Sequence, residues 1–260
     1  MTALSRESKR VLALFGKTPK KVVPSVGDEQ EYFLIKKDAY RKRKDLVITG
    51  RTLFGAAPCK GQELEEHYFG AIRPTVSAYM KDLDDELWAL GIPAKTKHNE
   101  VAPCQHELAP VYGEVNEAID QNLVMMEKMK LIASRHDLVC LLHEKPFEGI
   151  NGSGKHNNWS LGTESENLLD PGDTPLDNLQ FIVFLTAVIE AVDNYQELLR
   201  APLPRPATII VWAPTRLLRR LCPSSWATSL PRSSRRSSMA RLPSMPRAAC
   251  STWAPIPCPS

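Results

Sequence analysis

Residues 27–35, GDEQEYFLI, indicate the fold that we expect for the rest of the chain. The stretch alternates and is rich in residues that favour strands, so it predicts a β-strand. Side chains two apart on a strand share a face, so Glu29 and Glu31 would point in one direction. Two carboxylates that close repel each other unless a cation lies between them. Glu-x-Glu pairs also occur on solvated strand faces, so this pair alone does not define a site.

More acidic residues and one histidine lie in two later segments. Glu100 and Glu107 occur in HNEVAPCQHELAP (98–110), and His156 follows the glycine-rich turn of KPFEGINGSGKHNNWSL (145–161). Four carboxylates and one imidazole form an oxygen-rich ligand set that suits Mg²⁺ or Mn²⁺. His156 could also be an ordinary polar residue beside a turn, but its position among glycines and asparagines favours a functional role.

Residues 149–156 nearly match the phosphate-binding loop GxxxxGK[ST]. His156 stands where that loop has a magnesium-binding hydroxyl, and the Asn-Asn-Trp after it is a poor helix start. A true phosphate loop is therefore disfavoured. A glycine turn whose backbone approaches a substrate remains the better interpretation.

The composition favours a protein of the cytoplasm. Hydrophobic residues make up 43% of the 260 residues, enough for a packed core. No apolar run approaches the roughly 20 residues of a membrane-spanning helix. The N-terminal MTALSRESKRVLALFGKTPKK is too charged for a secretory signal. The six cysteines form no CxxC pair, so we expect neither a zinc site nor a disulfide framework.

The formal charge of +3 combines two unlike parts of the chain. Residues 201–260 contain nine arginines and no acidic residue, whereas the rest of the chain is acidic. A basic sequence can indicate nucleic-acid binding. Here the excess comes from one atypical segment, so we expect no nucleic-acid partner and no membrane partner. The segment also has eleven prolines and ten serines without periodicity, which is typical of a disordered tail.

Periodicity, together with proline and glycine positions, predicts the other elements. Helices are expected at residues 4–15, 73–90, 114–135 and 177–200. Further strands are expected at residues 46–48, 101–111 and 138–142, with a turn at 149–158. The apolar face expected for the helix at 114–135 consists of Ile119, Leu123, Met126, Met129 and Ile132. We interpret its methionines as core packing.

Five segments, in order and at suitable spacing, resemble the successive signatures of type III glutamine synthetases. They are GDEQEYFLI (27–35), TGRTLFGA (49–56), KGQELEEHYFG (60–70), HNEVAPCQHELAP (98–110) and KPFEGINGSGKHNNWSL (145–161). The resemblance implies an α+β fold, with part of the mixed, antiparallel sheet of a catalytic domain at 22–200 and helices outside it. Residues 1–21 would be a lead-in to this domain.

The resemblance also implies the roles of individual residues. The metal ligands would be Glu29, Glu31, Glu100 and Glu107, together with His156, which would bind the second metal. Asn151 and Gly152 would help to hold glutamate, and Ser160 would contact ATP. The implied reaction joins glutamate and ammonia with ATP through a γ-glutamyl phosphate, with Mg²⁺ or Mn²⁺ as cofactor. Intact members would form a homo-oligomeric ring whose active sites lie between neighbouring subunits.

The chain departs from the family pattern at two positions. Cys104 stands where the family usually has glycine, and Glu148 stands where it usually has a small residue. If the backbone at Cys104 has a positive φ, the side chain costs about 1 kcal/mol or more. Glu148 would add negative charge beside a site for anionic substrates.

We interpret residues 201–260 as the product of a shifted reading frame. Reading the last base of each codon with the first two of the next turns every Trp-Ala or Met-Ala junction into glycine. Such junctions occur at 212–213, 226–227, 239–240 and 253–254. The first two then coincide with glycines in family segments similar to LGANE and FLGDE. We expect a frameshift near residues 200–203, a tail that does not fold with the rest, and a chain that is inactive because later ligands are missing.

Two other functions remain open at this point. One is a related ligase that joins glutamate to another amine, because its glutamate and ATP motifs would look alike. The other is a non-catalytic, truncated product.

Overall fold

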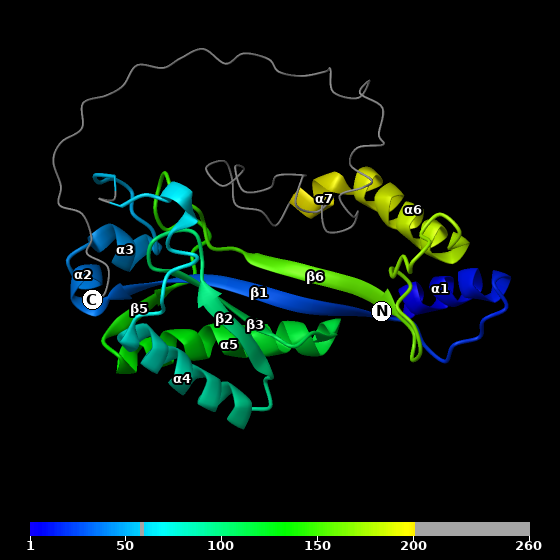
Figure 1. The fold of residues 1–260 in the computed structure, drawn as a ribbon, viewed down its shortest axis with the longest axis horizontal. Helices are drawn as coiled ribbons and strands as arrows, with labels where there is room; N and C mark the ends of the chain where they lie inside the picture. Colours follow the sequence, from blue (N-terminus) through cyan, green and yellow to red (C-terminus); the bar gives the residue numbers. More distant parts are fainter. Residues whose placement is uncertain (58–59, 201–260) are drawn as a thin grey trace, which may run out of the picture.

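The computed structural model describes residues 1–57 and 60–200, so the predicted tail lies outside the described residues. The fold is built on β1 (Val23–Lys36), a strand of 14 residues that forms antiparallel pairs along both edges (Figure 1). On one edge β1 pairs first with β6 (Lys155–Gly162) and then with β5 (Leu138–Leu141). This confirms the predicted α+β fold with an antiparallel sheet.

The opposite edge of β1 leads to the remaining strands. β4 (Gly113–Glu114) pairs with the first half of β1, and β3 (Gln105–Pro110) pairs further along it. β2 (Ala94–Asn99) then pairs antiparallel with β3. The segment predicted as extended at 101–111 therefore contains a turn at 101–104 before β3 begins.

The two faces of β1 pack against different elements. Tyr32 and Leu34 are fully buried with residues of α4 (Pro74–Ala89) and α5 (Val115–Arg135) in the largest core cluster. Phe33 and Ile35 point to the other face and pack in a second cluster. Because side chains alternate along a strand, Glu29 and Glu31 share the face of Phe33 and lie away from α4 and α5.

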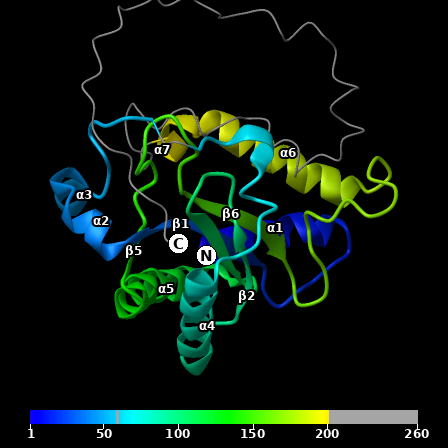
Figure 2. The same ribbon diagram turned by 60° about the vertical axis from the view of Figure 1, so that its left-hand side comes forward.

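The remaining helices lie at the ends and on the other side of the sheet. α6 (Leu179–Asn194) and α7 (Gln196–Arg200) lie opposite α4 and α5, as Figures 1 and 2 show. α1 (Thr2–Leu14) buries Leu12 against residues that include Leu161 of β6 and Phe184 of α6. No helix among residues 1–57 and 60–200 is both long and apolar enough to cross a membrane.

The helices at 4–15, 73–90 and 114–135 are confirmed as α1, α4 and α5. The predicted buried face of α5 is wrong, since Ile119 and Leu123 are exposed. The face that packs on the sheet carries Ala118, Asn122, Met125, Met129, Ile132 and Ala133. Met129 is nevertheless core packing, as predicted.

Two local predictions are also wrong. Residues 46–48 lie in the helix α3 (Lys44–Thr49), which follows the short α2 (Lys37–Arg41), and not in a strand. Asp45 explains this, because its carboxylate accepts bonds from Arg43 and from the backbone N–H groups of Leu46 and Leu53. The glycine-rich turn ends at Gly154, because the next residue already begins β6.

Candidate metal and substrate site

Glu29 and His156 face each other across β1 and β6. They are register partners, and His156 Nδ1 lies 2.7 Å from Glu29 Oε2. Asn158 Nδ2 donates to the second carboxylate oxygen of Glu29 at 2.6 Å. The strand pairing therefore brings together two of the predicted ligands that are 127 residues apart in sequence.

Glu31 lies directly opposite Glu107, on the edge of β1 that pairs with β3. Its Oε2 accepts a hydrogen bond of 3.1 Å from the backbone N–H of Gly154. Glu31 thus connects the carboxylate-bearing strands with the end of the glycine-rich loop.

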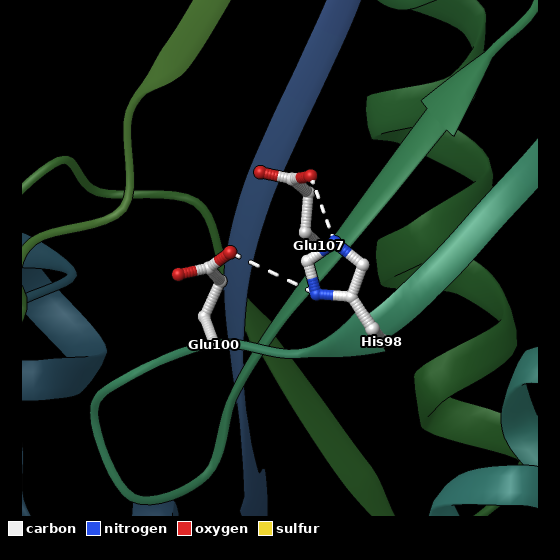
Figure 3. Close-up of side chains that lie close together, drawn as sticks. All are labelled: His98, Glu100 and Glu107. Carbon is white, nitrogen blue, oxygen red and sulfur yellow. Dashed lines mark ion pairs between the residues drawn. The ribbon is translucent and has the colours of Figure 1, made fainter. Parts of the chain in front are cut away.

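Glu100 and Glu107 flank His98, which lies on β2 as the register partner of Glu107 (Figure 3). His98 Nε2 is 3.2 Å from Glu107 Oε1, and His98 Nδ1 is 3.8 Å from Glu100 Oε1. One ligand atom from each of the three side chains lies within 4.8 Å of the other two. The side chains of Glu100 and Glu107 are only 13% and 10% exposed, so these carboxylates are largely withdrawn from water.

The electrostatics of Glu107 link these groups into one cluster. Burial raises the pKa of Glu107, and the negative charges of Glu29 and Glu100 raise it further. A carboxylate whose ionisation is opposed by its neighbours is stabilised by a cation beside it. The oxygen-rich donor set with imidazole nitrogens therefore fits Mg²⁺ or Mn²⁺.

The structure thus brings all five predicted ligands together on one region of the sheet. Their role as metal ligands remains a prediction.

The loop before β6 is held by specific contacts. Gln62 Oε1 accepts from the Asn151 backbone N–H at 2.6 Å, and Gln62 Nε2 donates to Asn151 Oδ1 at 3.2 Å. Gln105 Nε2 donates to the Gly152 carbonyl at 2.8 Å. A Cβ atom at Gly152 would lie 2.2 Å from the carbonyl oxygen of Glu144, so only glycine fits there.

Ser160 lies on β6 four residues beyond His156. At the rise of a β-strand this separates them by about 13 Å, and Ser160 Oγ donates to Asn167 Oδ1. The structure therefore does not bring Ser160 to the carboxylates.

Lys155 is the first residue of the strand β6, and its Nζ lies 3.2 Å from Asp28 Oδ1. A phosphate-binding loop leads into a helix, so the structure agrees that residues 149–156 do not form one.

Cys104 has a φ of 65°, which confirms the backbone condition on which its predicted strain depends. It is also disulfide-bonded, although the cysteine spacing predicted no disulfide framework. Spacing alone does not show which thiols meet in space. Glu148 is exposed and lies near Lys145, where it opposes the lowering of the Lys145 pKa by burial.

The sequence patterns did not identify His98, Gln62 or Gln105 as residues of this region. His98 had a usable signal, because it lies two residues before Glu100 in an extended segment, as Glu29 does before Glu31. No sequence pattern indicated Gln62 or Gln105, because their roles depend on contacts with a loop that is distant in sequence.

The arrangement described so far defines a class: an α+β domain with a cluster of carboxylates and histidines on its antiparallel sheet. A family model described as glutamine synthetase, catalytic domain, matches residues 8–192. The chain belongs to this family.

Individual relatives agree with the assignment. The chain is 62% identical over 202 residues to a glutamine synthetase of Butyrivibrio fibrisolvens. This alignment covers 77% of this chain and 29% of the relative. It is 50% identical over 208 residues to a type-3 glutamine synthetase of Dictyostelium discoideum, which covers 79% of this chain and 28% of the relative. The chain thus spans less than a third of the length of these curated relatives.

A solved structure shows the same fold. The cryo-EM structure of Plasmodium falciparum glutamine synthetase aligns with a TM-score of 0.52 at 15% identity, over 78% of this chain and 41% of that chain.

Proposed function

We propose that the protein is a glutamine synthetase-type ligase, which uses ATP to join ammonia to the γ-carboxyl group of glutamate. The observation that carries this proposal is the convergence of Glu29, Glu31, Glu100, Glu107 and His156 around β1 in a chain of this family.

Glu29 and His156 would hold one side of the metal site, and Glu31, Glu100 and Glu107 would hold the other. A bound Mg²⁺ or Mn²⁺ would neutralise charge on the phosphoryl oxygens during transfer. The partial burial of these carboxylates strengthens their interaction with a cation, because screening by water is reduced.

Asn151 and Gly152 would hold glutamate at the loop that Gln62 and Gln105 fix. The γ-carboxylate of glutamate would attack the γ-phosphorus of ATP, forming γ-glutamyl phosphate and releasing ADP. Ammonia would then attack the activated carbonyl carbon, and phosphate would leave. Ser160 would contact ATP further along β6, which agrees with its distance from the carboxylates.

The intact protein would act in the cytoplasm as a homo-oligomeric ring. The family match ends at residue 192, and the sequence after residue 200 departs from the family pattern. We therefore propose that this chain alone supplies the residues on only one side of the substrates, because the later family segments are absent from its sequence. Phosphoryl transfer depends on positioning and charge stabilisation, so the chain alone should lose nearly all of the rate.

The test compares this chain with a longer version in which the family frame is restored and the remaining family segments are supplied. Each is assayed for ATP-dependent formation of glutamine with Mg²⁺ or Mn²⁺, with polyamines as alternative amines. We expect glutamine from the longer version, and loss of activity with Glu107→Gln but not with Glu117→Gln on the exposed face of α5. A longer version that joins glutamate only to polyamines, or that makes no product, would contradict the proposal. Glutamine formed by the 260-residue chain would contradict its predicted inactivity.

A further inference from the structure

The segment at residues 60–70 connects β2 with the glycine-rich loop. Near its end, His67 Nδ1 lies 2.7 Å from the backbone carbonyl oxygen of Glu100, which fixes the segment beside the carboxylates. Near its start, the half-buried Gln62 contacts both the backbone and the side chain of Asn151. The segment therefore ties Asn151 to the rest of the site.

The backbone of the loop determines which way the Gln62 amide is turned. The backbone N–H of Asn151 can only donate, so the atom 2.6 Å from its nitrogen is the amide oxygen Oε1 of Gln62. Nε2 of Gln62 then faces the side chain of Asn151 and donates to its Oδ1 at 3.2 Å. The oxygen of the Asn151 side chain is thus used within the protein, and its Nδ2 group is left for a ligand.

The Nδ2 group of Asn151 offers two N–H donors. Asn151 is exposed, and its Nδ2 donates to no residue within 1–57 and 60–200. Such a group suits a carboxylate, which only accepts hydrogen bonds, and not an ammonium group, which only donates them. The orientation of this amide therefore favours an anionic end of a substrate.

The loop does not depend on Gln62 for its own shape. The backbone N–H of Ser153 donates to the Glu144 carbonyl at 2.7 Å, and Gln105 Nε2 donates to the carbonyl just before Ser153 at 2.8 Å. A change at Gln62 should therefore reorient the side chain of Asn151 without unfolding the loop.

We propose that Gln62 is a positioning residue, which turns the Asn151 amide so that Nδ2 donates to a carboxylate group of glutamate. The inference rests on the proposed function, in which Asn151 holds glutamate, and adds the residue that sets the polarity of this contact. Hydrogen bonds to charged groups are stronger than those between neutral groups. Turning the amide the other way should therefore weaken the binding of glutamate.

The test measures kcat and the KM values for glutamate and ATP in the longer version with the restored frame. In Gln62→Glu, residue 62 still accepts from the Asn151 backbone N–H, but its second oxygen also needs a donor, so Asn151 turns and presents its oxygen to the substrate. We expect the KM for glutamate to rise about tenfold or more, and the KM for ATP to change by less than about twofold.

Two further variants accompany Gln62→Glu. Gln62→Leu frees the Asn151 side chain without adding charge, so it should raise the KM for glutamate by about threefold. Gln121→Glu is the matched control, because it makes the same chemical change on α5, away from the loop. It should behave like the unmodified protein.

A double-mutant cycle separates the turned amide from the added charge. In an Asn151→Ala background there is no amide to turn, so Gln62→Glu should change the KM for glutamate by less than about twofold. An equal rise in both backgrounds, or no rise in either, would overturn the inference and leave the proposed function standing. If the longer version with Gln62 intact makes no glutamine, the proposed function fails and the inference falls with it.

Discussion

Glu31 of β1 and Glu107 of β3 are direct cross-strand partners, which places two acidic side chains opposite each other in a sheet. Like charges in this position are destabilising, and the raised pKa of Glu107 shows that its burial and further neighbouring carboxylates add to the cost. The cluster therefore lowers the stability of the metal-free fold, and the cation that we propose would offset this cost.

Replacing Glu107 with glutamine should stabilise the metal-free chain. The change removes one of the opposed charges and keeps the shape, so we expect a gain of about 0.5–1 kcal/mol in the free energy of unfolding at pH 7. The measurement is chemical denaturation in EDTA, repeated with Mn²⁺, which should stabilise the unmodified chain more than the variant. Glu117→Gln on α5 is the control. A Glu107→Gln variant less stable than the unmodified chain in EDTA would show that these charges do not oppose each other.

Gly152→Ala should disrupt the loop before β6, whereas Gly154→Ala should not. A Cβ at residue 152 meets the Glu144 carbonyl at 2.2 Å, while a Cβ at residue 154 has nothing within 4 Å. We expect Gly152→Ala to cost about 1–3 kcal/mol and to speed amide hydrogen exchange at residues 149–154. Melting temperatures and exchange rates check this. Equal effects of the two substitutions would be inconsistent with the observed packing.

Cys104→Gly should stabilise the turn between Glu100 and Glu107 when the thiol is kept reduced. Cys104 has a φ of 65°, which glycine adopts without the Cβ penalty. We expect Cys104→Gly to be more stable than Cys104→Ala by about 1 kcal/mol in reducing buffer. Alanine is the matched control because it removes the thiol and keeps the Cβ. Equal melting temperatures for the two variants would argue against strain at this residue.

Asp45 should contribute stability that disappears in acid. The hydrogen bond from Arg43 lowers the pKa of Asp45 to about 2, helped by the backbone N–H groups of Leu53 and Leu46. Because the folded-state pKa lies below that of the unfolded chain, the contribution is complete above about pH 4 and is lost as the pH falls toward 2.

Denaturation of Asp45→Asn at several pH values tests this. The variant should be less stable than the unmodified chain by about 2 kcal/mol at pH 7, and the difference should shrink between pH 4 and 2. A difference that stays constant over this range would show that the charge of Asp45 is not responsible.

The sequence predicted the elements whose patterns are strong. Alternation in GDEQEYFLI identified β1, and the positions of Pro74 and Gly91 identified the ends of α4. Residues 46–48 were assigned to a strand because a short apolar run does not distinguish strand from helix. Here the Asp45 side chain stabilises the start of the helix by accepting hydrogen bonds from Arg43 and from the backbone N–H of Leu53.

The buried face of α5 could not be read from hydrophobicity alone. Asn122 is 3% exposed and faces inward, whereas Leu123 is 62% exposed. The choice depends on what packs against each side of the helix, and a single sequence does not contain that information. In the same way, the resemblance named the five acidic and histidine residues that the structure brings together, but the contact of Gln62 with Asn151 depends on residues 89 positions apart.

The most direct test of the central claim is whether bound metal lies next to all five predicted ligands. Substoichiometric Mn²⁺ added to the ¹⁵N-labelled 260-residue chain broadens the amide signals nearest to the bound ion. We predict that the signals of residues 29, 31, 100, 107 and 156 broaden first and together, and that excess Mg²⁺ restores them. Broadening centred instead on exposed acidic residues such as Asp82 and Asp85 of α4, with the five sharp, would contradict it.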